Sequence, residues 1–248
     1  MNLRLILPHF YIELRFNVVV HFVRPLIDPE NAEGIDPDDP IFIPAITPAN
    51  GNDANTLLDD ISRKVNAIWV PQVNVKFNFA LANPVGPDKS PLNTIEYSSR
   101  TTPGVYYPDL SATNVEVNNI INATVSGFTD DENSNPFDGS IHLYFVTNFV
   151  NYPDGTRLDR PWGFTWIGRH YVFISDSPGT DSNQLARIIA HELGHSLGLE
   201  HTDELAPSSD GYKADITTLM WRDWVFVGGN HIGYAHWKQL NDANPEIE

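Results

Sequence analysis

The chain has 248 residues, no cysteine, and a formal net charge of −17 from 32 acidic and 15 basic residues. This length allows a single domain with a sizeable core, and the acidity argues against nucleic acid as a partner, because phosphate binding needs a basic surface. Without cysteine, disulfides, thiolate metal ligands and a cysteine nucleophile are excluded, so any metal site must use His, Asp or Glu.

The sequence indicates no membrane segment. No apolar run approaches the length of about 20 residues that a membrane-spanning helix needs. The first residues, MNLRLILPHFYIEL, make a poor signal peptide, because Pro8 and His9 interrupt the apolar stretch and no small-residue cleavage site follows.

The first third of the chain predicts a strand, a helix and a second strand. Residues Tyr11–Val23 alternate and then become apolar and β-branched, as an internal strand would. After an acidic, proline-rich loop at Asp28–Pro40, apolar residues recur at helical spacing over Asn55–Trp69. Strict alternation then predicts a strand over Val73–Leu81.

The middle of the chain predicts a long insertion followed by strands. Residues 82–138 are rich in Pro, Asn, Ser and Asp, and we expect little regular structure there beyond one helix around Val115–Val125. Apolar, β-branched runs then predict strands at Ile141–Phe149 and His170–Asp176, with a short strand at Trp162–Ile167 between them.

A second long helix follows these strands. Asp181 is its expected N-cap, with Gln184 three positions later as in a capping box, and the helix should run to about Leu197 and stop at Gly198. A final short helix is expected at Tyr234–Ala243. The order of elements predicts an α/β (α+β) fold with a mixed sheet.

The C-terminal half of that helix carries the most informative segment, RIIAHELGHSLGLEH. His191 and His195 are four residues apart, so both rings project from one helix face and can bind one ion. In a continued helix His201 would lie about 9 Å further along the axis. Gly198 tolerates a left-handed conformation, ends the helix and lets His201 return to the ion. The segment therefore predicts a three-histidine zinc site.

Glu192 stands beside the first predicted ligand. Three neutral histidines leave a fourth position on the ion open for water, which is the arrangement of a catalytic site. The Glu192 carboxylate can reach that water without being a ligand, so we predict that it takes a proton as general base and passes it to a leaving amine.

The full pattern resembles the signature of metzincin zinc peptidases: His191-Glu192-x-x-His195-x-x-Gly198-x-x-His201. The resemblance implies a methionine in a tight turn beneath the zinc, and Met220 is the only methionine besides Met1. It also implies one catalytic domain, with an upper subdomain over about residues 1–198 and a lower one over 199–248. A peptide or protein substrate would bind extended in the cleft between them, along an edge strand at Trp162–Ile167 or, as an alternative, Ile141–Thr147.

The branch of the metzincins stays open. The motif sequence HELGHSLGLEH is similar to that of matrixins, but Thr202 occupies the position where matrixins typically have serine. A pappalysin-like branch fits comparably. The resemblance implies secretion or another extracytoplasmic location. It also raises calcium as a second metal, for which the acidic loops at Asp28–Pro40 and Asp130–Gly139 offer oxygen ligands.

Two other functions remain as alternatives to a zinc endopeptidase. One is a peptide-binding module that keeps the metal without turnover, although such a module has no chemical need of Glu192. The other is a zinc hydrolase acting on a non-peptide amide or ester. The sequence gives no indication of oligomeric state.

Overall fold

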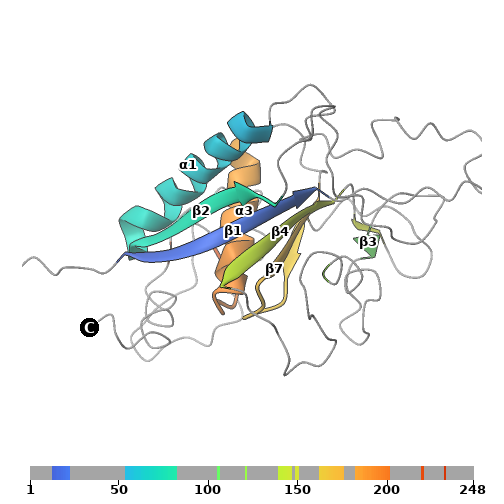
Figure 1. The fold of residues 1–248 in the computed structure, drawn as a ribbon. Coiled ribbons are helices and arrows are strands. Elements are labelled where there is room, and N and C mark those ends of the chain that lie inside the picture. The colour runs from blue at the N-terminus through green and yellow to red at the C-terminus, as the bar shows by residue number, and fades with distance from the viewer. Residues whose placement is uncertain are drawn as a thin grey trace, which may run out of the picture.

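A computed structural model of the chain (Figure 1) describes residues 13–22, 54–82, 105–106, 121, 139–146, 149–150, 162–175, 182–201, 219–220 and 232. Most of the regular structure in these ranges belongs to one five-stranded sheet and to two helices beside it.

The sheet has the strand order β2-β1-β4-β7-β6. Its strands are β1 Leu14–Phe22, β2 Val75–Leu81, β4 Ser140–Val146, β7 Tyr171–Ser175 and β6 Gly163–Thr165. Neighbouring strands from β2 to β7 are parallel, whereas β6 runs antiparallel to β7 at the edge. This confirms the predicted mixed sheet. A separate two-stranded parallel sheet consists of β3 Val105–Tyr106 and β5 Phe149–Val150.

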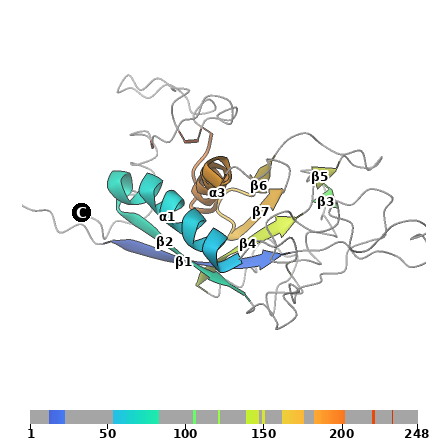
Figure 2. The same cartoon turned by 90° about the horizontal axis from the view of Figure 1, so that it is seen from above.

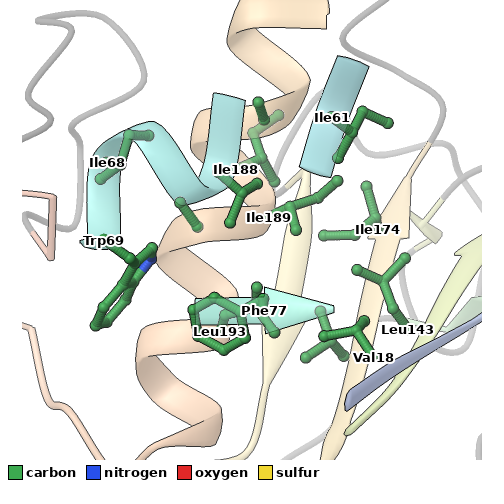
Figure 3. Close-up of a cluster of buried hydrophobic side chains, with 14 of the residues drawn as sticks. Val18, Ile61, Ile68, Trp69, Phe77, Leu143, Ile174, Ile188, Ile189 and Leu193 are labelled. Carbon is green, nitrogen blue, oxygen red and sulfur yellow. The ribbon is translucent and has the colours of Figure 1, made fainter. Parts of the chain in front are cut away.

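Helices α1 Ala54–Val73 and α3 Ser182–Ser196 lie side by side over one face of the large sheet (Figures 1 and 2). Because alternate residues of a strand point to the same face, the strands supply a layer of apolar side chains to these helices. Figure 3 shows the core between the sheet and the helices, where Val18, Phe77, Leu143 and Ile174 of the strands meet Ile61, Ile68 and Trp69 of α1 and Ile188, Ile189 and Leu193 of α3. Removal of their surfaces from water is the main force that holds α3 against the sheet.

The end of α1 is set by Asn74, which adopts a left-handed conformation with φ of 55°. Its N–H still donates to Val70 O at 3.0 Å, and its own carbonyl accepts from Leu14 N at 3.1 Å, so the residue ends the helix and joins it to β1. Asn66 also links α1 to the sheet. Its amide donates to Phe77 O at 2.9 Å, and its Oδ1 accepts from Phe77 N at 2.8 Å, which satisfies outward backbone groups of the edge strand β2.

The structure confirms the predicted helix at Asn55–Trp69 and extends it through Pro71 to Val73. Pro71 cannot donate the backbone hydrogen bond of its position, and the helix ends two residues after it. The strand predicted from Val73 therefore begins at Val75.

The other predicted strands have the following outcome. The strand at Ile141–Phe149 is divided, since β4 ends at Val146 and Phe149 belongs to β5. The strands at Trp162–Ile167 and His170–Asp176 are confirmed as the shorter β6 and β7.

Several sequence predictions concern residues beyond the described ranges. These are the loop at Asp28–Pro40, most of the insertion 82–138, the N-cap Asp181 and the helix at Tyr234–Ala243. Within the insertion, Ile121 is helical and buried, in agreement with a helix around Val115–Val125. Neither α1 nor α3 combines the length and apolar character that crossing a membrane requires.

Candidate metal centre

Two of the three predicted metal ligands lie in the buried C-terminal half of α3. His191 and His195 are 4% and 5% exposed, and every residue from Ile188 to Ser196 is buried. Helix α1 and the strands β6 and β7 all pack against α3, and both rings are buried. A ligand pair whose rotamers are fixed in this way needs little reorganisation to bind an ion.

The helix ends in the turn that the sequence predicted. Gly198 has a φ of 88°, its N–H donates to His195 O at 2.9 Å, and Leu199 N donates to Gly194 O at 3.0 Å. These two bonds form a Schellman motif, in which a left-handed residue satisfies the last free carbonyls of the helix. His195 O also accepts from Gly168 N at 2.8 Å, so the turn after β6 is attached to the same helix end.

This turn brings His201 back to the helical pair. One ligand nitrogen from each of His191, His195 and His201 lies within 4.8 Å of the others. Nε2 of His195 and Nε2 of His201 are 3.1 Å apart. Two nitrogens on one tetrahedral zinc ion, each at about 2.05 Å, would lie about 3.3 Å apart, so the separation suits a shared ion.

Backbone carbonyls orient two of the three rings. His191 Nδ1 lies 2.6 Å from Leu219 O, and His195 Nδ1 lies 2.7 Å from Leu199 O. A carbonyl can only accept, so in each neutral ring Nδ1 carries the proton and Nε2 keeps its lone pair for a metal. Neutral imidazole rings whose Nδ1 atoms are hydrogen-bonded to backbone carbonyls are well suited to bind zinc through Nε2.

The electrostatics of His195 favour the same state. The pKa of His195 is lowered to about 4, chiefly by burial and next by the nearby His201, while the bond to the Leu199 carbonyl opposes the shift. The ring is therefore neutral at physiological pH, as a metal ligand must be.

Glu192 is buried beside the histidines and is 6% exposed. Burial raises the pKa of its carboxyl group to about 8 in the metal-free protein, and the neighbouring Thr165 hydroxyl opposes this rise. Neither Glu192 Oε2 nor Thr165 Oγ1 has a hydrogen-bond partner among the described residues. A buried carboxyl group with a free oxygen is suited to exchange a proton with a bound molecule.

Met220 lies against the middle of the ligand pair. It is fully buried with Leu219 in a turn, and a Cβ placed on Gly194 would overlap its Sδ atom. Gly194 therefore leaves room between the two ligand positions of α3 for the methionine side chain. This contact and the Leu219–His191 hydrogen bond attach the later part of the chain to the site.

The structure thus brings together all six residues that the sequence singled out: Glu192, His191, His195, His201, Gly198 and Met220. Sequence reasoning missed the neighbours Leu219, Gly194, Gly163 and Thr165. Gly194 had a visible signal, since it is a glycine inside a helix between two proposed ligands. The others had none, because their role depends on which strand or turn packs against α3.

A mixed sheet beside a helix with HExxH, and a third histidine returned by a glycine turn, is consistent with a metzincin-like fold. No protein-family model matches the chain. A stretch of 83 residues, 32% of the chain, is 35% identical to human matrix metalloproteinase-16 and to its Mus musculus counterpart. A stretch of 102 residues, 40% of the chain, is 32% identical to human matrix metalloproteinase-15.

These matches span only 12% and 13% of the length of the relatives. The chain therefore shares distant, partial homology with the matrixins, and its histidine triad is consistent with a zinc site of the HExxH…H kind.

Proposed function

We propose that the protein is a zinc-dependent endopeptidase. His191, His195 and His201 hold one zinc ion, and Glu192 is the general base. The observation that carries the proposal is the convergence of the three ligand nitrogens, within 4.8 Å of one another, beside a buried carboxyl group. The partial similarity to proteins named matrix metalloproteinases supports the same reaction.

Each residue of the proposed site has a separate role in the reaction. Zinc, when bound, lowers the pKa of a water molecule and polarises a carbonyl group. Glu192 Oε2, which has no partner among the described residues, accepts the proton of the water and later donates it to the leaving amine. The carbonyls of Leu219 and Leu199 keep the His191 and His195 rings in the metal-binding tautomer.

The proposed substrate is a peptide in extended conformation. Strand β6 is one edge of the large sheet and lies beside α3, with its Gly163 next to Glu192. A peptide that adds to this edge as a further strand would pass the proposed site, with backbone hydrogen bonds giving affinity.

Further parts of the proposal rest on the metzincin resemblance. Met220, as the methionine of a Met-turn, packs against the helix that carries His191 and His195. Gly198 turns the chain so that His201 reaches the same ion. The chain is one catalytic domain with subdomains over about residues 1–198 and 199–248. Secretion and calcium binding by the acidic loops belong to the same set of proposals.

Mass-spectrometric cleavage profiling of a mixed peptide library tests the function. The zinc-loaded wild type is compared with Glu192→Ala, which keeps the three ligands. We expect internal cuts with the wild type and a loss of about 100- to 10,000-fold with the variant. Equal cutting by both proteins, or binding of peptides by zinc-loaded wild type without any cut, would refute the proposal.

A further inference from the structure

Strand β6 approaches the Glu192 side chain through a glycine. Gly163 is buried, and a Cβ built on it would lie 2.8 Å from Glu192 Cγ, 2.9 Å from Oε1 and 3.0 Å from Cδ. Carbon and oxygen atoms in ordinary contact are about 3.5 Å apart or more. The Glu192 side chain therefore occupies the volume that any other residue at position 163 would fill.

The backbone does not explain the glycine. Gly163 lies in a regular antiparallel pair with Ile174, and it is not among the glycines with positive φ. An alanine can adopt this conformation without strain, and it loses less conformational entropy on folding than glycine does. Position 163 has no room for a side chain, because the Glu192 side chain already fills that space.

Thr165 is a second neighbour of Glu192 on β6: its hydroxyl group is near enough to lower the pKa of the carboxyl group, although the two make no hydrogen bond in this geometry. Thr165 is two residues after Gly163, so both lie on the same face of the strand. Gly163 leaves the space and Thr165 places a buried hydroxyl group beside the carboxylate. A glutamate has several freely rotating bonds, and these contacts restrict it where a general base must be held to within about 0.5 Å.

We propose that Gly163 is a positioning residue, which fixes the Glu192 carboxylate against β6 because no Cβ stands between them. The inference rests on the proposed function, since it assigns Gly163 a part in that reaction through Glu192. The overlapping atoms Cγ, Cδ and Oε1 belong to the Glu192 side chain and not to the backbone, so an added methyl group displaces the carboxylate and leaves β6 in place.

The first test measures stability and needs no enzymatic activity. Gly163→Ala is introduced into the metal-free wild type and into the Glu192→Ala variant, and thermal unfolding is followed for all four proteins. We expect the melting temperature to fall in the wild-type background, where methyl and carboxylate collide. It should rise in the Glu192→Ala background, where only the benefit of replacing glycine in a strand remains. A fall of the same size in both backgrounds would overturn the proposal.

The second test measures catalysis with a peptide found by the library. Gly163→Ala should bind zinc with unchanged affinity and keep KM within about twofold, while kcat falls about 100-fold, as expected for a misplacement of about 1 Å. Thr165→Val, which removes the hydroxyl group and keeps the shape, should lower kcat by a smaller factor. Unchanged kcat in Gly163→Ala would overturn the positioning role.

The two tests separate the inference from the function on which it rests. If zinc-loaded wild type cuts no peptide, the proposed function and the catalytic part of the inference both fail. If wild type cuts peptides but Gly163→Ala has the same kcat, only the inference fails. Independently of activity, opposite changes in melting temperature in the wild-type and Glu192→Ala backgrounds show that the carboxylate occupies the space beside Gly163.

Discussion

The Leu219 carbonyl oxygen lies 2.6 Å from His191 Nδ1, although the two residues are 28 positions apart in the chain. The contact orients a proposed zinc ligand on α3 from a turn that belongs to the later part of the chain. Met220 follows Leu219 and is buried against Gly194, so its packing holds the carbonyl in place.

Replacing Met220 should therefore affect both the fold and the metal site. Met220→Ala opens a cavity beside Gly194, and we expect a loss of about 2–5 kcal/mol in the free energy of unfolding. Because the Leu219 carbonyl shifts with it, zinc affinity should fall about 10- to 100-fold. Met220→Leu conserves volume and should cost less than about 1.5 kcal/mol. Denaturant unfolding and zinc competition measure the two effects, and Met220→Ala with wild-type zinc affinity would contradict this account.

Gly198 is predicted to control the return of His201. With φ at 88°, an alanine at this position is strained by about 1–2 kcal/mol. If the turn relaxes, that strain reappears as a loss of about tenfold in zinc affinity. Gly198→Asn, which tolerates the left-handed region, should lie between alanine and wild type. A competition titration with a chromophoric chelator checks this order; a weaker site in the asparagine variant than in the alanine variant would exclude it.

The burial of Glu192 gives the metal-free protein a pH dependence of stability. Its pKa is about 8 in the fold against 4.5 as the ordinary value, so the folded state holds this proton more tightly. The resulting stability is complete below about pH 4.5 and is lost as the pH rises toward 8. Denaturant unfolding in the presence of a chelator should show this loss in the wild type.

Glu192→Gln provides the control, because it retains shape and cannot ionise. The difference in unfolding free energy between glutamine and glutamate should grow from pH 5 to pH 8, in favour of glutamine. The lowered pKa of His195 acts in both proteins and cancels in this difference. A difference that does not change with pH would show that the carboxylate is not buried in this way.

Asn66 is expected to matter for the fold and not for the metal. Its side chain makes both hydrogen bonds to the Phe77 backbone, and Asn66→Ala leaves these groups without a protein partner. We expect a loss of about 1–3 kcal/mol in the free energy of unfolding, with unchanged zinc affinity. Asn66→Asp keeps the acceptor for Phe77 N–H but sets a second carboxylate oxygen against the Phe77 carbonyl, so it should also destabilise the fold. Urea unfolding of the two variants tests this, and equal stability of wild type and Asn66→Ala would contradict it.

The three histidines, Glu192 and Gly198 could be predicted because their chemistry is local in sequence, whereas Met220 was predicted only from the metzincin resemblance. Helical spacing fixes the relation of His191 to His195, and a glycine turn is short enough to return His201 without help from distant segments. The longer strands and helices were predictable for a related reason, since their apolar residues recur with a clear period. Helix α1 runs past its predicted end, through Pro71, to the left-handed residue Asn74 that ends it.

Features that depend on distant partners could not be predicted. Strands β3 and β5 have two residues each, which is too short for any period, and they exist only through their pairing. The buried pair of His21 Nε2 and His142 Nδ1, 2.9 Å apart, joins residues separated by 121 positions. Gly163 is a third case, since nothing in its sequence neighbourhood tells which side chain fills the space above it.

The most direct test of the central claim is a zinc titration of the metal-free protein, with wild type beside His201→Ala. His201 is the ligand that only the folded turn brings to the other two. We predict one tightly bound equivalent for wild type and an affinity lower by about 100-fold or more for the variant. One equivalent bound with unchanged affinity by His201→Ala would contradict the three-histidine site and the function built on it.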